Sequence, residues 1–139
     1  AEVEGKAVFD IGSGSGILGL LAVAVGAHSV RGIEIDVDAV RVSNENAERN
    51  GMASSVHFDD TDLATIDDTF PVVVANIEAK VLVPLAETIM ARVQKGGLLV
   101  LSGILGPQRD EVIQAYSRFA CTSVPEKGEW IALVLRAPA

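Results

Sequence analysis

The sequence predicts one α/β domain, residues 1–139, built on a mostly parallel β-sheet of seven strands with an antiparallel hairpin at its end. Strand-like and helix-like segments alternate along most of the chain, as they do where helical crossovers join parallel strands. A glycine-rich turn at residues 12–16 separates the first strand from the first helix. Two strand-like segments then follow one another around Lys127-Gly128, which is typical of a hairpin.

The predicted strands are short apolar segments, and several are rich in β-branched residues, as expected of strands that are covered on both faces. They lie at residues 7–11, 29–35, 55–58, 71–77, 98–104, 121–126 and 129–136.

The predicted helices lie at residues 17–25, 39–50, 80–94 and 107–119. The first is apolar on every face, which indicates a helix buried in the α/β layers. Asp36 or Asp38 can cap the second helix, and Asn50-Gly51 can end it. Pro84 and Pro107 fall near the starts of the third and fourth helices, where a missing N–H costs least.

Composition and charge exclude several classes of protein. The net charge of −8 argues against direct nucleic-acid binding and favours a basic partner.

No charged residue lies between Asp10 and Arg31, but glycines and polar residues interrupt this stretch, so we expect no membrane span. Cys121 is the only cysteine, which favours a reducing compartment such as the cytoplasm. Nothing near the two histidines indicates a metal site, and the oligomeric state is left open.

The residues around the glycine turn indicate which class of cofactor it would bind. A dinucleotide fingerprint would need its third glycine at position 17, which is Ile17. Asp10 precedes the turn, where its carboxylate would repel a pyrophosphate but would suit a ligand with an amino group and a sulfonium. Glu34 lies 22 residues after Gly12, at the end of the second strand, where a carboxylate accepts hydrogen bonds from ribose hydroxyls. This combination indicates S-adenosylmethionine (SAM) and makes a nicotinamide cofactor a distant alternative.

Four stretches carry a resemblance to a known family: "VFDIGSGSGIL", "GIEIDVDAV" with "NENAERNG", "VVVANIEA", and "KGGLLVLSGIL" followed by "GEWIALVL". Over its whole length the sequence resembles the class I SAM-dependent methyltransferases, and it looks most like the PrmA family of ribosomal protein methyltransferases. The resemblance implies a Rossmann-like class I methyltransferase fold.

The resemblance also implies roles for individual residues. A SAM loop would be formed by the residues at and before the glycine turn, namely Asp10, Gly12, Ser13, Gly14 and Gly16. Glu34 would hold the ribose, and Ile35 would pack against the adenine. Asp62 would accept a hydrogen bond from the adenine amino group, with Leu63 beside it. Asn76 would be both a SAM contact and the catalytic residue, between the methionine end of the cofactor and the incoming nucleophile.

Simpler interpretations stay open for several of these residues. Asp62 belongs to a run of aspartates that fits a solvated loop, and Asn76 precedes a helix that it could cap. Ser102 and Gly103 are expected to shape the floor of the active site. For Trp130, packing in the core is favoured over contact with a substrate.

The implied activity is SAM-dependent N-methylation of a basic protein substrate, such as a lysine of a ribosomal protein, with S-adenosylhomocysteine (SAH) as product. The resemblance implies an N-terminal substrate-recognition domain in members of the family, and because only a few residues precede the first strand we expect that domain to be absent from this chain. Two alternatives therefore remain. The chain could methylate a small molecule or RNA, or it could bind SAM and be inactive without a partner domain.

Overall fold

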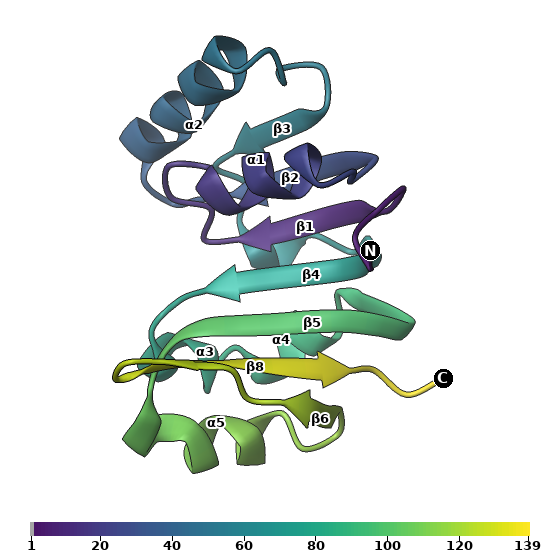
Figure 1. The fold of residues 1–139 in the computed structure, drawn as a ribbon, viewed down its shortest axis with the longest axis vertical. Helices are drawn as coiled ribbons and strands as arrows, with labels where there is room; N and C mark the ends of the chain where they lie inside the picture. The colour runs from purple at the N-terminus through teal and green to yellow at the C-terminus, as the bar shows by residue number, and fades with distance from the viewer. Residues whose placement is uncertain (1) are drawn as a thin grey trace. The chain divides into compact units, whose positions relative to one another are not determined.

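The computed structural model describes residues 2–139, and the chain divides between Asp67 and Asp68 into two compact units (Figure 1). Both units contain strands and helices, so the α/β class is confirmed.

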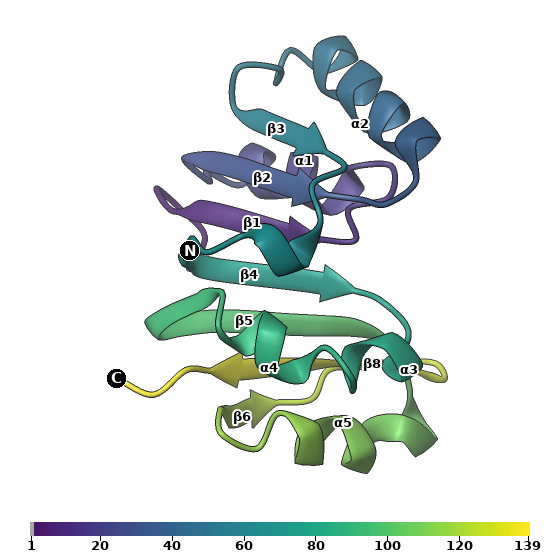
Figure 2. The ribbon, with the colours of Figure 1, turned by 180° about the vertical axis from the view of Figure 1, so that it is seen from behind.

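The first unit is a parallel sheet of three strands in the order β3-β2-β1. Asp10 of β1 is paired in register with Gly32 of β2, which is paired in turn with Phe58 of β3. Helix α1 lies in front of β1 and β2 in Figure 1 and behind them in Figure 2. The elements are β1 (Ala7–Ile11), α1 (Ile17–Ala24), β2 (Ser29–Ile33), α2 (Val37–Arg49), β3 (Val56–Asp59) and the 3-10 turn η1 (Leu63–Thr65).

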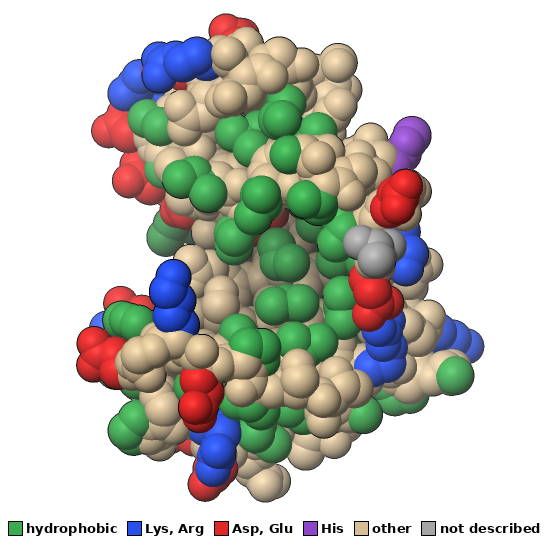
Figure 3. All heavy atoms as spheres, in the orientation of Figure 1, with side chains coloured by type: hydrophobic (Ala, Val, Ile, Leu, Met, Phe, Trp, Pro, Cys, Tyr) green, Lys and Arg blue, Asp and Glu red, His purple; other side chains and the backbone are tan. Residues whose placement is uncertain are grey.

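Helix α1 is buried on one face and exposed on the other. Gly19 lies against β2 so closely that a Cβ there would come within 2.9 Å of Val30 Cγ1. The predicted burial on every face is wrong, because no described residue of this unit covers the outer face. Figure 3 shows hydrophobic side chains at the surface in this region. The exposed ones on or just after α1 are Ile17, Leu18, Leu21 and Val25.

Helix α2 starts at Val37, two residues before the predicted start, and of the two predicted N-caps Asp36 is the one that the structure shows. The carboxylate of Asp36 accepts a hydrogen bond from the backbone N–H of Asp38 at 2.9 Å, so Asp36 is the N-cap. Asn50 is the C-cap, and Gly51 follows it in the left-handed region with φ of 69°.

The second unit is built on β8, which is antiparallel to β5, β6 and β7, while β4 and β5 run parallel. The strand order is β4-β5-β8-β6. Its elements are β4 (Phe70–Asn76), α3 (Ala79–Leu82), α4 (Ala86–Met90), β5 (Val93–Leu105), the 3-10 turn η2 (Gly106–Gln108), α5 (Arg109–Ala115), β6 (Ala120–Ser123), β7 (Glu126–Lys127) and β8 (Trp130–Arg136). Its core includes the fully buried Val73, Leu99, Leu101, Ile104 and Leu133.

The predicted helix at 80–94 is wrong in its extent. The structure has two short helices, α3 and α4, on either side of Pro84. Proline lacks an N–H, and its ring clashes with the preceding turn, so Pro84 interrupts the helix instead of starting it. The next helix also differs from the prediction, because η2 precedes α5 and α5 ends at Ala115.

The first unit contributes three strands and the second five, so residues 2–139 form eight strands where the sequence predicted seven. The additional strand is β7, whose two residues pair with β8 across a turn at Gly128. The predicted terminal hairpin is therefore confirmed in outline. Within the described residues, every helix is too short or too polar to cross a lipid bilayer.

Candidate functional site

The glycine turn of the first unit is tied to the end of β2. The backbone N–H groups of Gly12 and Ser13 both donate to the carbonyl of Ile33, at 2.9 and 3.0 Å. Gly14 has φ of 54°, and a Cβ added to it would meet nothing within 4 Å. The backbone at Gly14 is therefore open to a ligand that approaches closely.

Gly16 has a different function in the turn. Its φ is 85°, and a Cβ there would come within 3.0 Å of Phe58 Cζ and 3.1 Å of Ser43 Oγ. Gly16 thus lets α1 begin against α2 and β3, whereas Gly14 leaves space for something outside the chain.

Two residues of α2 that were not predicted as site residues hold the carbonyl groups of the turn. Ser43 Oγ donates to the carbonyl of Gly14 at 2.6 Å, and Asn46 Nδ2 donates to that of Ser15 at 3.1 Å. Ser43 is fully buried although it lies in a polar helix. The three-residue spacing of these two side chains puts them on one helix face, and this was the available signal.

Glu34 connects the turn to the segment that follows β2. Its Oε1 accepts from the backbone N–H of Gly14 at 2.9 Å, and its Oε2 accepts from that of Asp36 at 3.1 Å. Each carboxylate oxygen has a further lone pair for a ligand hydroxyl. Ile35, the next residue, is 91% exposed, which is unusual for an isoleucine and leaves an apolar surface beside Glu34.

Asp10 lies in the interior of the unit and is 1% exposed. Burial raises the pKa of Asp10 to about 7. The backbone N–H of Gly19 offsets part of this rise, and the charge of Glu34 adds to it. Neither carboxylate oxygen has a hydrogen-bond partner of ordinary geometry, and the buried Ser13 Oγ also has none. The Asp10 carboxylate and the Ser13 hydroxyl therefore lie beneath the glycine turn, in the interior of the first unit.

A charged cluster fixes the loop after β3. Asp59 contacts His57 Nε2 at 2.8 Å and Arg31 at 3.4 Å, and it accepts from the backbone N–H of Thr61 at 2.9 Å. Burial opposes the charge of Asp59, but Thr61, Arg31 and His57 together hold its pKa below the usual value. Among residues 2–139, no group of three or more His, Cys, Asp or Glu side chains is arranged to hold a metal ion.

The loop that begins at Asp59 starts beside Glu34, whose backbone N–H donates to the Asp59 carbonyl at 3.1 Å. Asp62 is exposed and is the N-cap of η1, and its Oδ1 accepts from the backbone N–H of Ala64 at 3.0 Å. Leu63 is half-buried. Asp62 therefore caps η1 and keeps its second oxygen available.

The second unit contains a pocket of about 540 Å³ at the end of β4. Asn76 and Ser102, which are paired in register, line it together with Gly103. A Cβ at Gly103 would come within 2.8 Å of Asn76 Oδ1, so this glycine makes room for the amide. The interpretation of Asn76 as a helix cap is wrong, because the N-cap of α3 is Glu78.

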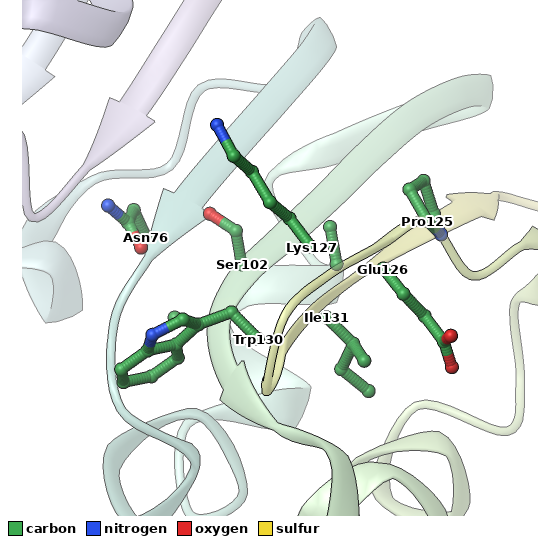
Figure 4. Close-up of a pocket in the computed structure, with 9 residues that line it drawn as sticks. Asn76, Ser102, Pro125, Glu126, Lys127, Trp130 and Ile131 are labelled. Carbon is green, nitrogen blue, oxygen red and sulfur yellow. The ribbon is translucent and has the colours of Figure 1, made fainter.

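Trp130 and Lys127 also line this pocket (Figure 4). Trp130 is 50% exposed, so the prediction that it packs in the core is wrong. As the first residue of β8, it stands beside the hairpin turn, at the end of a strand that is paired on both sides. The Lys127 side chain extends past Ser102 in Figure 4, while the Glu126 carboxylate points the other way.

The comparisons with known proteins agree with one another. A family model for ribosomal protein L11 methyltransferase (PrmA) matches residues 1–138. The chain is 44% identical over 131 residues to the ribosomal protein L11 methyltransferase of Geobacter sp. (strain M21), covering 94% of this chain and 43% of that protein. For the enzyme of the same name from Enterobacter sp. (strain 638), identity is 43% over 140 residues, covering 97% and 46%. The chain thus spans less than half the length of the curated relatives it matches.

Solved structures show the same likeness. The ribosomal protein L11 methylase from Lactobacillus delbrueckii subsp. bulgaricus has a TM-score of 0.93 at 32% identity, covering 100% of this chain and 73% of that one. An RNA methyltransferase from Salinibacter ruber, solved with S-adenosyl-L-homocysteine, has a TM-score of 0.82 at 24% identity, covering 99% and 85%. The second likeness concerns the fold alone. The predicted methyltransferase fold class is confirmed, with eight strands in place of seven.

Proposed function

Because this chain belongs to the ribosomal protein L11 methyltransferase family, we propose that it binds SAM and methylates the amine of a lysine in a basic protein. The observation that carries the proposal is the turn at Gly14, where an open backbone lies within hydrogen-bond distance of the Glu34 carboxylate. A ligand that needs close backbone contact and an acceptor for its hydroxyls fits this arrangement.

Residues of the first unit fit the nucleoside of SAM. Glu34 would accept hydrogen bonds from the ribose hydroxyls with its remaining lone pairs. The 91% exposed side chain of Ile35 would lie against the adenine, and contact with a flat apolar ring would remove its surface from water. Asp62 would accept from the adenine amino group with its free oxygen, next to Leu63. The buried Asp10 would act indirectly, beneath the turn.

Residues of the second unit fit the methyl acceptor. The bound cofactor would supply an electrophilic methyl group on a sulfonium, so the chain needs to orient the acceptor more than to activate it. A free lysine has a pKa of about 10.4, and its amine must lose a proton before it can attack. The pocket at Asn76 suits a neutral amine, because the Asn76 amide and the Ser102 hydroxyl are uncharged and Lys127 disfavours a second cation.

The proposed partner is a basic protein, namely a ribosomal protein, which would place the enzyme in the cytoplasm. A net charge of −8 would steer a basic partner toward this chain. Relatives are more than twice as long, and the residues that they have in addition would supply further contacts to such a partner.

The experiment uses labelled SAM and ribosomal protein L11 with two proteins: this chain, and a longer chain that adds the remaining residues of a relative. We expect methyl transfer by the longer chain and weak transfer by this chain, although both bind SAM. Equal transfer by both would show that the core alone recognises its substrate. If neither transfers a methyl group to any protein tested, the proposed activity is wrong.

A further inference from the structure

We propose that Trp130 divides a two-pocket groove in which the larger pocket takes the acceptor lysine and a smaller one takes a basic side chain flanking it. This inference rests on the proposed function and adds a feature of the substrate, a basic residue next to the methylated lysine.

The smaller pocket measures about 290 Å³, and the two pockets share part of their lining. Trp130 and Gly103 line both of them. On one side, Trp130 is paired in register with Leu105, which lines the smaller pocket and not the larger one. On the other side, it is paired with Lys127, which lines the larger pocket and not the smaller one. A peptide that places one side chain against each side of Trp130 would therefore occupy both pockets at once.

The lining of the smaller pocket suits an arginine or lysine side chain. Leu105 and Trp130 offer apolar surface to an aliphatic stem. Gln108 is held in place because its Oε1 accepts from the backbone N–H of Leu105 at 2.9 Å. Glu78 supplies a carboxylate for the cation, and it contacts Lys80 Nζ at 3.2 Å. A bound cation would compete with Lys80 for this carboxylate.

An acidic flanking residue that pairs with Lys80 is the opposite possibility. The basic residue is favoured because Glu78 is the carboxylate that lines the smaller pocket, Lys127 lies in the larger pocket and not in this one, and the whole chain carries −8. Glu78 and Lys80 are 70% and 80% exposed, so water screens their interactions. We therefore expect changes of about two- to fivefold in affinity at low salt, and their loss at about 1 M salt.

Fluorescence reports directly on this groove, because Trp130 is the only tryptophan of the chain. Acetylated and amidated tripeptides with a central lysine are titrated into the chain at low salt. The two flanking residues are both arginine, both glutamine or both glutamate. We expect a change in Trp130 emission with the arginine and glutamine peptides, and about two- to fivefold tighter binding of the arginine peptide.

Two substitutions have opposite expected effects. Glu78→Gln removes the carboxylate and should abolish the preference for arginine over glutamine. Lys80→Gln removes the competing cation and should increase that preference about twofold or more. The matched controls are Glu87→Gln and Arg118→Gln, because this exposed ion pair of 2.7 Å lines neither pocket. Neither control should change the preference.

The proposal is overturned if no peptide changes the Trp130 emission, if the glutamate peptide binds most tightly, or if both Glu78→Gln and Lys80→Gln reduce the preference. SAH binding, measured by calorimetry on the same samples, reports separately on the proposed function. Normal SAH binding without a preference for arginine would refute the groove alone, whereas loss of SAH binding by the unsubstituted chain would refute the proposed function.

Discussion

Glu34 Oε1 lies 2.9 Å from the backbone nitrogen of Gly14 and accepts its hydrogen bond. The residue that would hold the ribose therefore also fixes the position of the turn that would contact the rest of the cofactor. Loss of this carboxylate would remove the proposed ribose contact together with the hydrogen bond at Gly14, while the bonds from Gly12 and Ser13 to the Ile33 carbonyl would remain.

Glu34→Ala is expected to weaken SAH binding at least tenfold. Each charge-assisted hydrogen bond that is lost contributes about 1.5–3 kcal/mol, and 1.4 kcal/mol corresponds to a factor of ten. Isothermal titration calorimetry gives the dissociation constant. Glu45→Ala is the control, because Glu45 forms an exposed ion pair with Arg41 on α2. An unchanged dissociation constant in a folded Glu34→Ala chain would rule out the ribose contact.

Asp10→Asn should change how stability depends on pH. The folded-state pKa of Asp10 is raised from 3.8 to about 7, so the folded chain binds more protons than the unfolded chain between these values. The unsubstituted chain should therefore lose stability as pH rises from 4 to 8, by up to about 4 kcal/mol from this group. Asp10→Asn should not show this loss.

Urea unfolding at pH 4.5, 6 and 8 measures the difference between the two chains. Asp60→Asn is the control, since Asp60 is exposed in the loop after β3. The interpretation of Asp10 as a buried carboxyl with a raised pKa is wrong if the free energies of unfolding of the unsubstituted chain and of Asp10→Asn differ by the same amount at all three pH values.

Ser43→Ala should loosen the glycine turn without touching a ligand. It leaves the Gly14 carbonyl without its hydrogen bond of 2.6 Å, at a cost of about 1–3 kcal/mol. We expect a lower free energy of unfolding and weaker SAH binding, because the turn would have to be ordered when the ligand binds. The exposed Ser54→Ala serves for comparison. Equal behaviour of the two variants would show that α2 does not support the turn.

Gly103→Ala should disturb Asn76 and the adjoining backbone of Ile77, whose N and O would both lie 3.2 Å from the new Cβ. The new Cβ would lie 2.8 Å from Asn76 Oδ1. The alanine itself would have to adopt φ of 80°, which strains any residue other than glycine. Methyl transfer by the longer chain should fall strongly for Gly103→Ala and for Asn76→Ala, while SAH affinity changes less than twofold. Gly128→Ala carries a similar strain, with φ of 62°, but its Cβ would meet nothing within 4 Å. If Gly128→Ala reduces transfer equally, backbone strain and not Asn76 explains the loss.

Local signals in the sequence were sufficient to predict most of the fold. The alternation of apolar segments predicted the strands, and Asp36 with Asn50-Gly51 defined the ends of α2 closely. The effect of Pro84 was predicted wrongly. Proline is acceptable in the first turn of a helix and disruptive further along, and the sequence does not show which of the two applies. The exposed face of α1 was missed because hydrophobicity alone does not reveal what covers a helix.

The site was predictable only where a residue type implies its own chemistry. Glu34 and the glycines could be proposed as site residues from their spacing after strand-like segments, and the structure joins Glu34 to Gly14 by a hydrogen bond. Ser43 acts through a contact with Gly14, 29 residues earlier in the chain, and such a contact depends on how α2 packs. Trp130 was expected in the core because tryptophan is mostly buried, yet its place at the start of β8 leaves half of it exposed.

Calorimetric titration of the chain with SAH and, separately, with NAD distinguishes a SAM site from a dinucleotide site without knowledge of the methyl acceptor. We expect SAH to bind at one site per chain, Glu34→Ala to weaken this binding, and NAD to give no binding heat. Binding of NAD in place of SAH, or no binding of SAH by the folded chain, would show that the glycine turn and Glu34 do not form a SAM site.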